Sequence, residues 1–216
     1  MKRIIILLLI FGWIYGQSNL GRVDGQLKMQ NQLIDALQDS TKALVTIDYA
    51  HHEVHDGSSF MYTYADADFD LGDSVIVAFV TPNSTEQLHF VGSAGNSSAC
   101  TVYLCEAPTI TAAKGTNVIT YNRNRASADT SSILSSKDST EQYVTLITAG
   151  DQSNNGTVLE TYTLGSGKNK IAGATRDFNE WILNEYTKYS FMVIGTANDG
   201  ILDLRIGWYE HTPTAP

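Results

Sequence analysis

The chain has 216 residues, of which only 17% are charged, and its formal net charge is −9 at pH 7. This length suits one sizeable domain, or one domain with a short N-terminal element, and excludes two full cores. The negative charge argues against nucleic-acid binding, because affinity for the phosphate backbone comes from Lys and Arg. Abundant Ser, Thr, Asn, Gly and Tyr favour a mostly β fold with many turns.

Residues 1–16 form an apolar N-terminal segment. Lys2 and Arg3 precede an apolar run over residues 4–15, and the small Gly16 follows it. This order is typical of a secretory signal peptide, which would make the protein secreted. As a helix the run is about 18 Å long, which is shorter than the roughly 30 Å core of a bilayer. Three interpretations stay open: a cleaved signal, a start codon assigned too early, or a retained apolar helix packed on a partner.

Residues 17–43 are expected to form a short helical or extended arm. Four apolar residues have helical or coiled-coil spacing over about two heptads, namely Val23, Leu27, Ile34 and Leu37. A helix this short is marginal by itself, so it would pack in an oligomer or on another protein. A flexible linker is the alternative.

From residue 44 onward, the apolar residues recur with a period of two. This pattern predicts a β-sandwich or jelly-roll-like domain over residues 44–211, followed by a C-terminal tail at 212–216. The Ser- and Asp-rich residues 125–142 are expected to form a long surface loop. Strands are predicted at 44–50, 59–65, 74–81, 87–92, 100–106, 117–122, 143–149, 158–164, 189–197 and 201–211.

A histidine cluster, YAHHEVHDG at residues 49–57, begins within the first predicted strand and is read as strand-like. His52-Glu53-Val54-His55 is one residue short of the helical HExxH zinc motif. On a strand, His51 and His55 would share one face with Glu53, but they would lie roughly 13 Å apart, too far to bind one ion. A metal would therefore need a further ligand, with His89 or His211 as candidates. His51 and His55 are the only metal candidates retained, and hydrogen-bonded imidazoles on a polar strand are the alternative.

Other motifs favour structure over chemistry. DADFDLGD, residues 66–73, has its glycine one place late for a calcium loop and predicts an acidic turn. GSGKNK, residues 165–170, lacks the spacing of a phosphate loop and predicts a glycine turn. No nucleophile elbow or catalytic carboxylate pair stands out, so no catalytic residue is assigned. Trp181 and Trp208 are predicted to anchor the core, with sugar stacking by Trp208 as an alternative.

The two cysteines, Cys100 and Cys105, lie five residues apart in the predicted strand ACTVYLCE. Five steps along a strand place them on opposite faces, about 16 Å apart, which is beyond disulfide reach. We expect free thiols, with an intermolecular bridge as the alternative. Free thiols favour assembly in a reducing compartment.

Six segments of the chain, taken in their order, form a further pattern. They are YAHHEVHDGSSF, TPNSTEQLHFVGSA, TVYLCEAPT, YNRNRAS, GSGKNKIAGATRDFNEWILNEYTKYSF and IGWYEH. Together they resemble an uncharacterised family of virion structural proteins from tailed bacteriophages, and the resemblance covers about residues 44–211.

The resemblance implies a non-enzymatic capsid decoration or cement protein that stabilises the head, with a jelly-roll-like fold and a homotrimeric state. Its partners would be the major capsid protein or other virion proteins, and no cofactor, nucleic acid or small-molecule substrate is implied. The expected location is the virion, after assembly in the host cytoplasm. Two alternatives stay open: a tail or head-fibre appendage that binds a host surface glycan, and an exported lectin-like β-sandwich module.

Overall fold

The computed structural model describes residues 49–165, 171–172 and 180–212. They belong to one structural unit, Tyr49–Pro216. The predictions for residues 1–16 and 17–43, most of the strand at 44–50, most of the glycine turn at 165–170, and most of the 212–216 tail lie outside the described residues.

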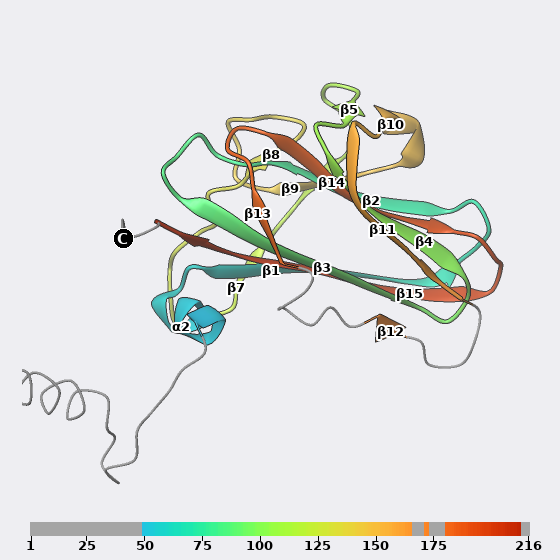
Figure 1. The fold of residues 1–216 in the computed structure, drawn as a ribbon, viewed down its shortest axis with the longest axis horizontal. Helices are drawn as coiled ribbons and strands as arrows, with labels where there is room; N and C mark the ends of the chain where they lie inside the picture. Colours follow the sequence, from blue (N-terminus) through green and yellow to red (C-terminus); the bar gives the residue numbers. More distant parts are fainter. Residues whose placement is uncertain (1–48, 166–170, 173–179, 213–216) are drawn as a thin grey trace, which may run out of the picture. The chain divides into compact units, whose positions relative to one another are not determined.

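The described chain is mostly β, with two antiparallel sheets packed face to face (Figure 1). The first sheet has the order β12-β3-β15-β1-β7, and β13 also pairs with β3. Its strands are β1 (Ser59–Phe69), β3 (Gln87–Asn96), β7 (Tyr121–Asn122), β12 (Ile171–Ala172), β13 (Trp181–Leu183) and β15 (Gly200–His211). The predicted mostly β, sandwich-like fold is confirmed.

The second sheet has the order β11-β4-β14-β2-β9-β6, and β8 also pairs with β2. Its strands are β2 (Ser74–Val80), β4 (Cys100–Glu106), β6 (Thr116–Val118), β8 (Leu134–Ser135), β9 (Val144–Ile147), β11 (Thr157–Leu164) and β14 (Lys188–Gly195). Separately, β5 (Thr109–Ile110) pairs with β10 (Gln152–Asn154), next to the 3-10 helix η1 (Ala149–Asp151).

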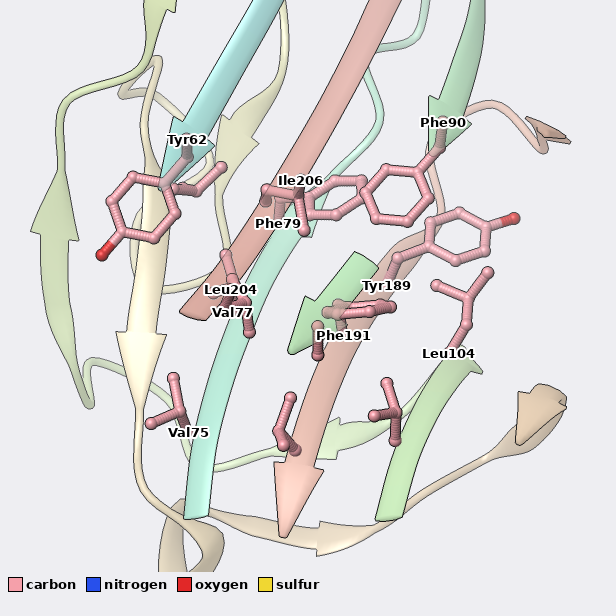
Figure 2. Close-up of a cluster of buried hydrophobic side chains, with 14 of the residues drawn as sticks. Tyr62, Val75, Val77, Phe79, Phe90, Leu104, Tyr189, Phe191, Leu204 and Ile206 are labelled. Carbon is pink, nitrogen blue, oxygen red and sulfur yellow. The ribbon is translucent and has the colours of Figure 1, made fainter. Parts of the chain in front are cut away.

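The main core fills the space between the two sheets, because alternate residues of each strand point inward. Figure 2 shows Phe90 and Ile206 from the first sheet meeting Phe79, Tyr189 and Phe191 from the second. Trp208 belongs to this core and is only 1% exposed, so its predicted anchoring role is confirmed and sugar stacking by Trp208 is wrong. Trp181 is partly buried against the same core, as predicted.

A smaller apolar cluster covers the outer face of the second sheet. It combines residues of β2, β9 and β14 with Ile110 from β5, and its buried members are Ile76, Ala78, Ile110, Ile147 and Met192. Because this cluster covers the outer face, β2 has five consecutive buried residues, although its side chains still alternate between the two faces.

The cysteine prediction is confirmed: Cys100 and Cys105 are free and buried in β4. Cys100 belongs to the main core between the sheets. Burial raises the pKa of both thiols, since a thiolate is poorly solvated there. Both side chains therefore serve as small apolar groups.

Three sheet-to-sheet turns lie at one end of the sandwich. β1 and β3 run antiparallel to β15, so the turns β1–β2, β3–β4 and β14–β15 come together. The amide of Asp70 donates to Asp73 Oδ2 at 2.8 Å, and that of Asp199 donates to Asp70 Oδ1 at 2.7 Å. The predicted acidic turn at 66–73 is thus confirmed only for residues 70–73, because residues 66–69 belong to β1. Within the described ranges, no group of three or more His, Cys, Asp or Glu side chains is arranged to hold a metal ion.

One strand prediction and one loop prediction are wrong. The single strand predicted at 117–122 is two strands in different sheets, since β6 pairs with β9 and β7 pairs with β1. The predicted surface loop at 125–142 contains β8 and the buried Ser131 and Ile133. Ile133 is in the main core, so this segment is part of the packed structure.

Candidate functional site

All five histidines of the chain lie toward the end of the sandwich opposite the three turns. His51, His52 and His55 are on helix α2 (Tyr49–Asp56), which packs on β1 and β15. His89 is near the start of β3, and His211 is the last residue of β15. We call this region the α2 end. It holds every imidazole of the chain, although these come from three separate elements.

The strand-like reading of the histidine cluster is wrong, because residues 49–56 form a helix. The helix ends in a Schellman motif at Gly57, whose φ is +81°. The amide of Ser58 donates to the Glu53 carbonyl at 3.1 Å, and that of Gly57 donates to the Val54 carbonyl at 3.3 Å. The buried Ala50, Glu53 and Gly57 have helical spacing, but a Glu and a Gly form no apolar stripe, so the sequence held no clear signal for this helix.

The helix brings His51 and His55 together, since residues four apart are neighbours on a helical face. Their Nε2 atoms are 3.1 Å apart, and their rings stack with centroids at 4.9 Å and an interplanar angle of 17°. Both side chains are exposed. The 13 Å separation expected for a strand therefore does not apply.

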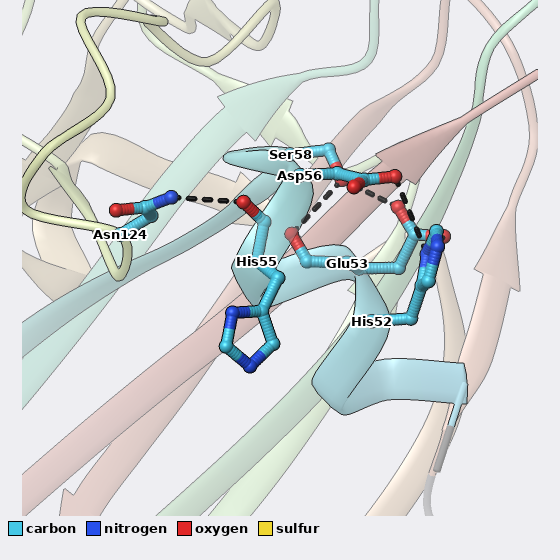
Figure 3. Close-up of polar contacts among 6 residues, drawn as sticks. All are labelled: His52, Glu53, His55, Asp56, Ser58 and Asn124. Carbon is cyan, nitrogen blue, oxygen red and sulfur yellow. Dashed lines mark hydrogen bonds and ion pairs between the residues drawn. The ribbon is translucent and has the colours of Figure 1, made fainter. Parts of the chain in front are cut away.

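Glu53 does not share the face of His51 and His55. Its side chain is buried and accepts a hydrogen bond from Ser58 Oγ (Figure 3). A site of two histidines and this carboxylate is excluded by that placement. On the exposed side, His52 Nδ1 lies 3.3 Å from Asp56 Oδ2, another pair with i,i+4 spacing.

β7 and the residues directly after it fix the C-terminal turn of α2. Asn124 Nδ2 donates to the His55 carbonyl at 2.9 Å, as Figure 3 shows, and Asn122 Nδ2 donates to the Gly57 carbonyl at 2.6 Å. These amides satisfy carbonyls that have no partner within the helix. The short helix is thereby held in one position against the sandwich.

A second histidine network lies between β3, β13 and the end of β15. His89 Nδ1 is 2.6 Å from Glu180 Oε1, which also accepts a 2.6 Å hydrogen bond from Tyr209 Oη. The His89 ring stacks on Tyr209 at 4.4 Å and lies 4.8 Å from the His211 ring. Burial lowers the pKa of His89, and the contact with Glu180 offsets part of this effect. Neither His89 nor His211 joins His51 and His55 in a group that could share one metal ion.

Glu210 ties the loop after β7 to β15. Its Oε1 accepts hydrogen bonds from Ser131 Oγ at 2.6 Å and Trp208 Nε1 at 2.9 Å. Its Oε2 accepts one from the Ser132 amide at 2.9 Å. The residue is only 8% exposed, so the carboxylate replaces its lost water contacts with these three donors.

Two grooves open beside this network. The larger one, about 500 Å³, is lined by Phe60, Ile119, Thr120, Asn122, Asp129, Thr130, Ser131, Glu141, Gln142 and Tyr143. The smaller one, about 270 Å³, is lined by Asp56, Gly57, Ser58, Phe60, Glu86, Asp129, Thr130, Ser132 and Glu210. The described residues that line them include five carboxylates and no Lys or Arg. This lining suits hydroxyl-rich or cationic ligands and disfavours anions.

The chain matches no protein-family model, no curated protein and no solved structure. Over the described ranges, the helices are too short and too polar to cross a membrane.

Proposed function

We propose that this protein is a non-enzymatic structural component of a bacteriophage particle, most plausibly a capsid decoration or cement protein that stabilises the head. The observation that carries the proposal is where the family-like segments lie. Parts of YAHHEVHDGSSF, TPNSTEQLHFVGSA, YNRNRAS and IGWYEH, which are distant in sequence, meet at the α2 end. Contacts that join them include the Glu210 amide with the Ser58 carbonyl at 3.0 Å, and Asn124 with His55.

A preformed surface of this kind suits binding to another protein. The Schellman turn and the amides of Asn122 and Asn124 hold α2 in place before any partner arrives. Binding then costs little conformational entropy, so even a modest interface can be stable. Summed over many copies on one particle, such interfaces would add substantially to head stability.

Three carboxylates at this end support a structural role over a catalytic one. Glu53 binds Ser58, Glu180 binds His89 and Tyr209, and Glu210 binds three donors. These acceptors are used within the fold, whereas a general base must be able to reach the proton of a substrate. The partners in this proposal are the major capsid protein and two further copies of the chain in a trimer.

The larger groove favours a second candidate, an appendage that binds a host surface glycan. Tyr143 and the 64% exposed Ile119 offer apolar surface for a sugar ring. Asp129, Glu141 and Gln142 offer acceptors and an amide for its hydroxyl groups. An exported lectin-like module would use the same groove, if the N-terminal segment is a signal peptide.

Quantitative mass spectrometry of purified phage particles tests these proposals. Decoration predicts hundreds of copies per particle, and a fibre predicts a few or dozens. Absence of the protein from particles would overturn both. The N-terminal peptide in the same data would show whether residues 1–16 are retained.

A pair of charge reversals tests the α2 end as the contact surface. Asp56 is exposed on α2, and Asp68 is exposed near the opposite end of β1. Incorporation into particles should fall for Asp56→Arg and stay at the parental level for Asp68→Arg. Equal incorporation of both variants would show that the contact with the head lies elsewhere.

A further inference from the structure

His51 and His55 are two exposed histidines of α2 whose Nε2 atoms contact each other. The two Nε2 atoms are 3.1 Å apart, which is the contact of one N–H donor with one lone-pair acceptor. Both Nε2 atoms are therefore close enough to contact the same ion beside the helix. Glu53 points into the protein and His52 faces Asp56, so neither takes part in this contact.

We propose that His51 and His55 form a two-histidine site for a late first-row divalent metal ion, with Cu²⁺ bound most tightly. An ion about 2.0–2.1 Å from each Nε2 would see the two nitrogens at an angle of about 100°. That angle lies between the ideal values for square-planar and tetrahedral coordination. On binding, the donor ring moves its proton from Nε2 to Nδ1, so both rings stay neutral and both Nε2 lone pairs are free for the ion, and small rotations of the exposed rings complete the alignment.

The donor set decides which metals qualify. Neutral imidazole suits Cu²⁺, Ni²⁺ and Zn²⁺, whereas Ca²⁺ and Mg²⁺ require oxygen ligands. Because no third His, Cys, Asp or Glu joins the pair within the described residues, water supplies the remaining ligands. The order of affinity should therefore follow the general preference for Cu²⁺ over Ni²⁺ and Zn²⁺.

Metal binding at this pair is coupled to the helix. An extended chain would separate the two rings widely, so the ion binds only the helical form of residues 49–56. Binding should therefore stabilise α2 and its packing on β1 and β15. This inference does not depend on the proposed role in a phage particle.

Calorimetric titration of the metal-free full chain with Cu²⁺ tests the site, using three single variants. His51→Ala and His55→Ala should each weaken the tightest binding step at least tenfold, since one imidazole cannot chelate. His52→Ala is the matched control, because it removes another exposed histidine of the same helix and should leave that step unchanged. Electron paramagnetic resonance of the 1:1 complex should show two equivalent nitrogen ligands, and one after either substitution of the pair.

Three results would overturn the proposal. The first is no Cu²⁺ binding that depends on His51 or His55, and the second is an equal loss in His52→Ala. The third is Ca²⁺ competing with Cu²⁺ for the same step, which would indicate oxygen ligands. Circular dichroism of each variant without metal shows whether the fold is intact, and His51→Gln and His55→Gln replace any alanine variant that is not.

Discussion

Replacing Glu210 by Gln changes one buried oxygen and keeps the shape of the side chain. The carboxylate accepts hydrogen bonds from Ser131 Oγ, Trp208 Nε1 and the Ser132 amide. An amide has one oxygen, which would stay near Ser131 and Trp208. Its NH₂ group would then face the Ser132 amide, so two donors would meet where a donor and an acceptor now lie 2.9 Å apart.

The expected loss of stability follows from this single mismatch. Leaving a buried donor unsatisfied costs about 1–3 kcal/mol, and hydrogen bonds to a charged acceptor lose further strength when the charge is removed. The Ser132 amide retains a weaker second contact, at 3.1 Å to Oε1, which limits the damage. We therefore expect Glu210→Gln to lower the free energy of unfolding by about 2 kcal/mol.

Urea denaturation, followed by tryptophan fluorescence, measures this loss. For a slope of about 2 kcal/mol/M, the midpoint should fall by about 1 M with the slope unchanged. Glu185→Gln is the matched control, because Glu185 is exposed and should shift the midpoint very little. If both variants unfold at the same urea concentration, the Glu210 network does not hold the 131–133 segment in place.

Two further substitutions test packing and pH dependence. Gly92→Ala should destabilise the domain by about 1–3 kcal/mol in the same assay, because a Cβ there would overlap the buried Phe191 ring. A Cβ at Gly150 would meet nothing, so Gly150→Ala is the control, and an equal effect of both would refute the packing argument. Burial raises the pKa of Tyr162 to about 12, so its stabilising contribution is complete below about pH 10 and is lost as pH rises through 12. Urea midpoints at about pH 9 and about pH 11.5 should therefore decline less for Tyr162→Phe than for the exposed control Tyr186→Phe, and equal declines would contradict this assignment.

The strands were largely predictable from the sequence because their alternation is local. β4 was predicted at its observed bounds, and the opposite-face placement of its cysteines followed from the same period of two. Burial of Trp208 was also expected from its apolar surroundings. In each case one face of a strand is buried between the two sheets. This burial produces an alternating apolar pattern in neighbouring residues of the sequence.

The α2 end was mispredicted because its structure depends on distant partners. Residues 49–56 contain β-favouring Tyr49 and Val54, but packing on β1 and β15 and the amides of Asn122 and Asn124 stabilise a helix. An eight-residue helix has little stability alone, so local pattern could not decide the outcome. Because residues 49–56 form a helix and not a strand, His51 and His55 are a contacting pair, whereas the strand prediction had separated them.

By itself, the sequence determined the β class, the paths of the long strands and the inward-facing residues, since these depend on a short-range period. Only the tertiary structure decided which sheet each short strand joined and that residues 131–133 are buried. It also decided that five histidines from three elements gather at one end. These features depend on contacts between residues far apart in the chain, such as the 78-residue separation between Ser132 and Glu210. A local sequence pattern cannot indicate such contacts. The candidate site of this protein depends on them, because its residues come from separate elements.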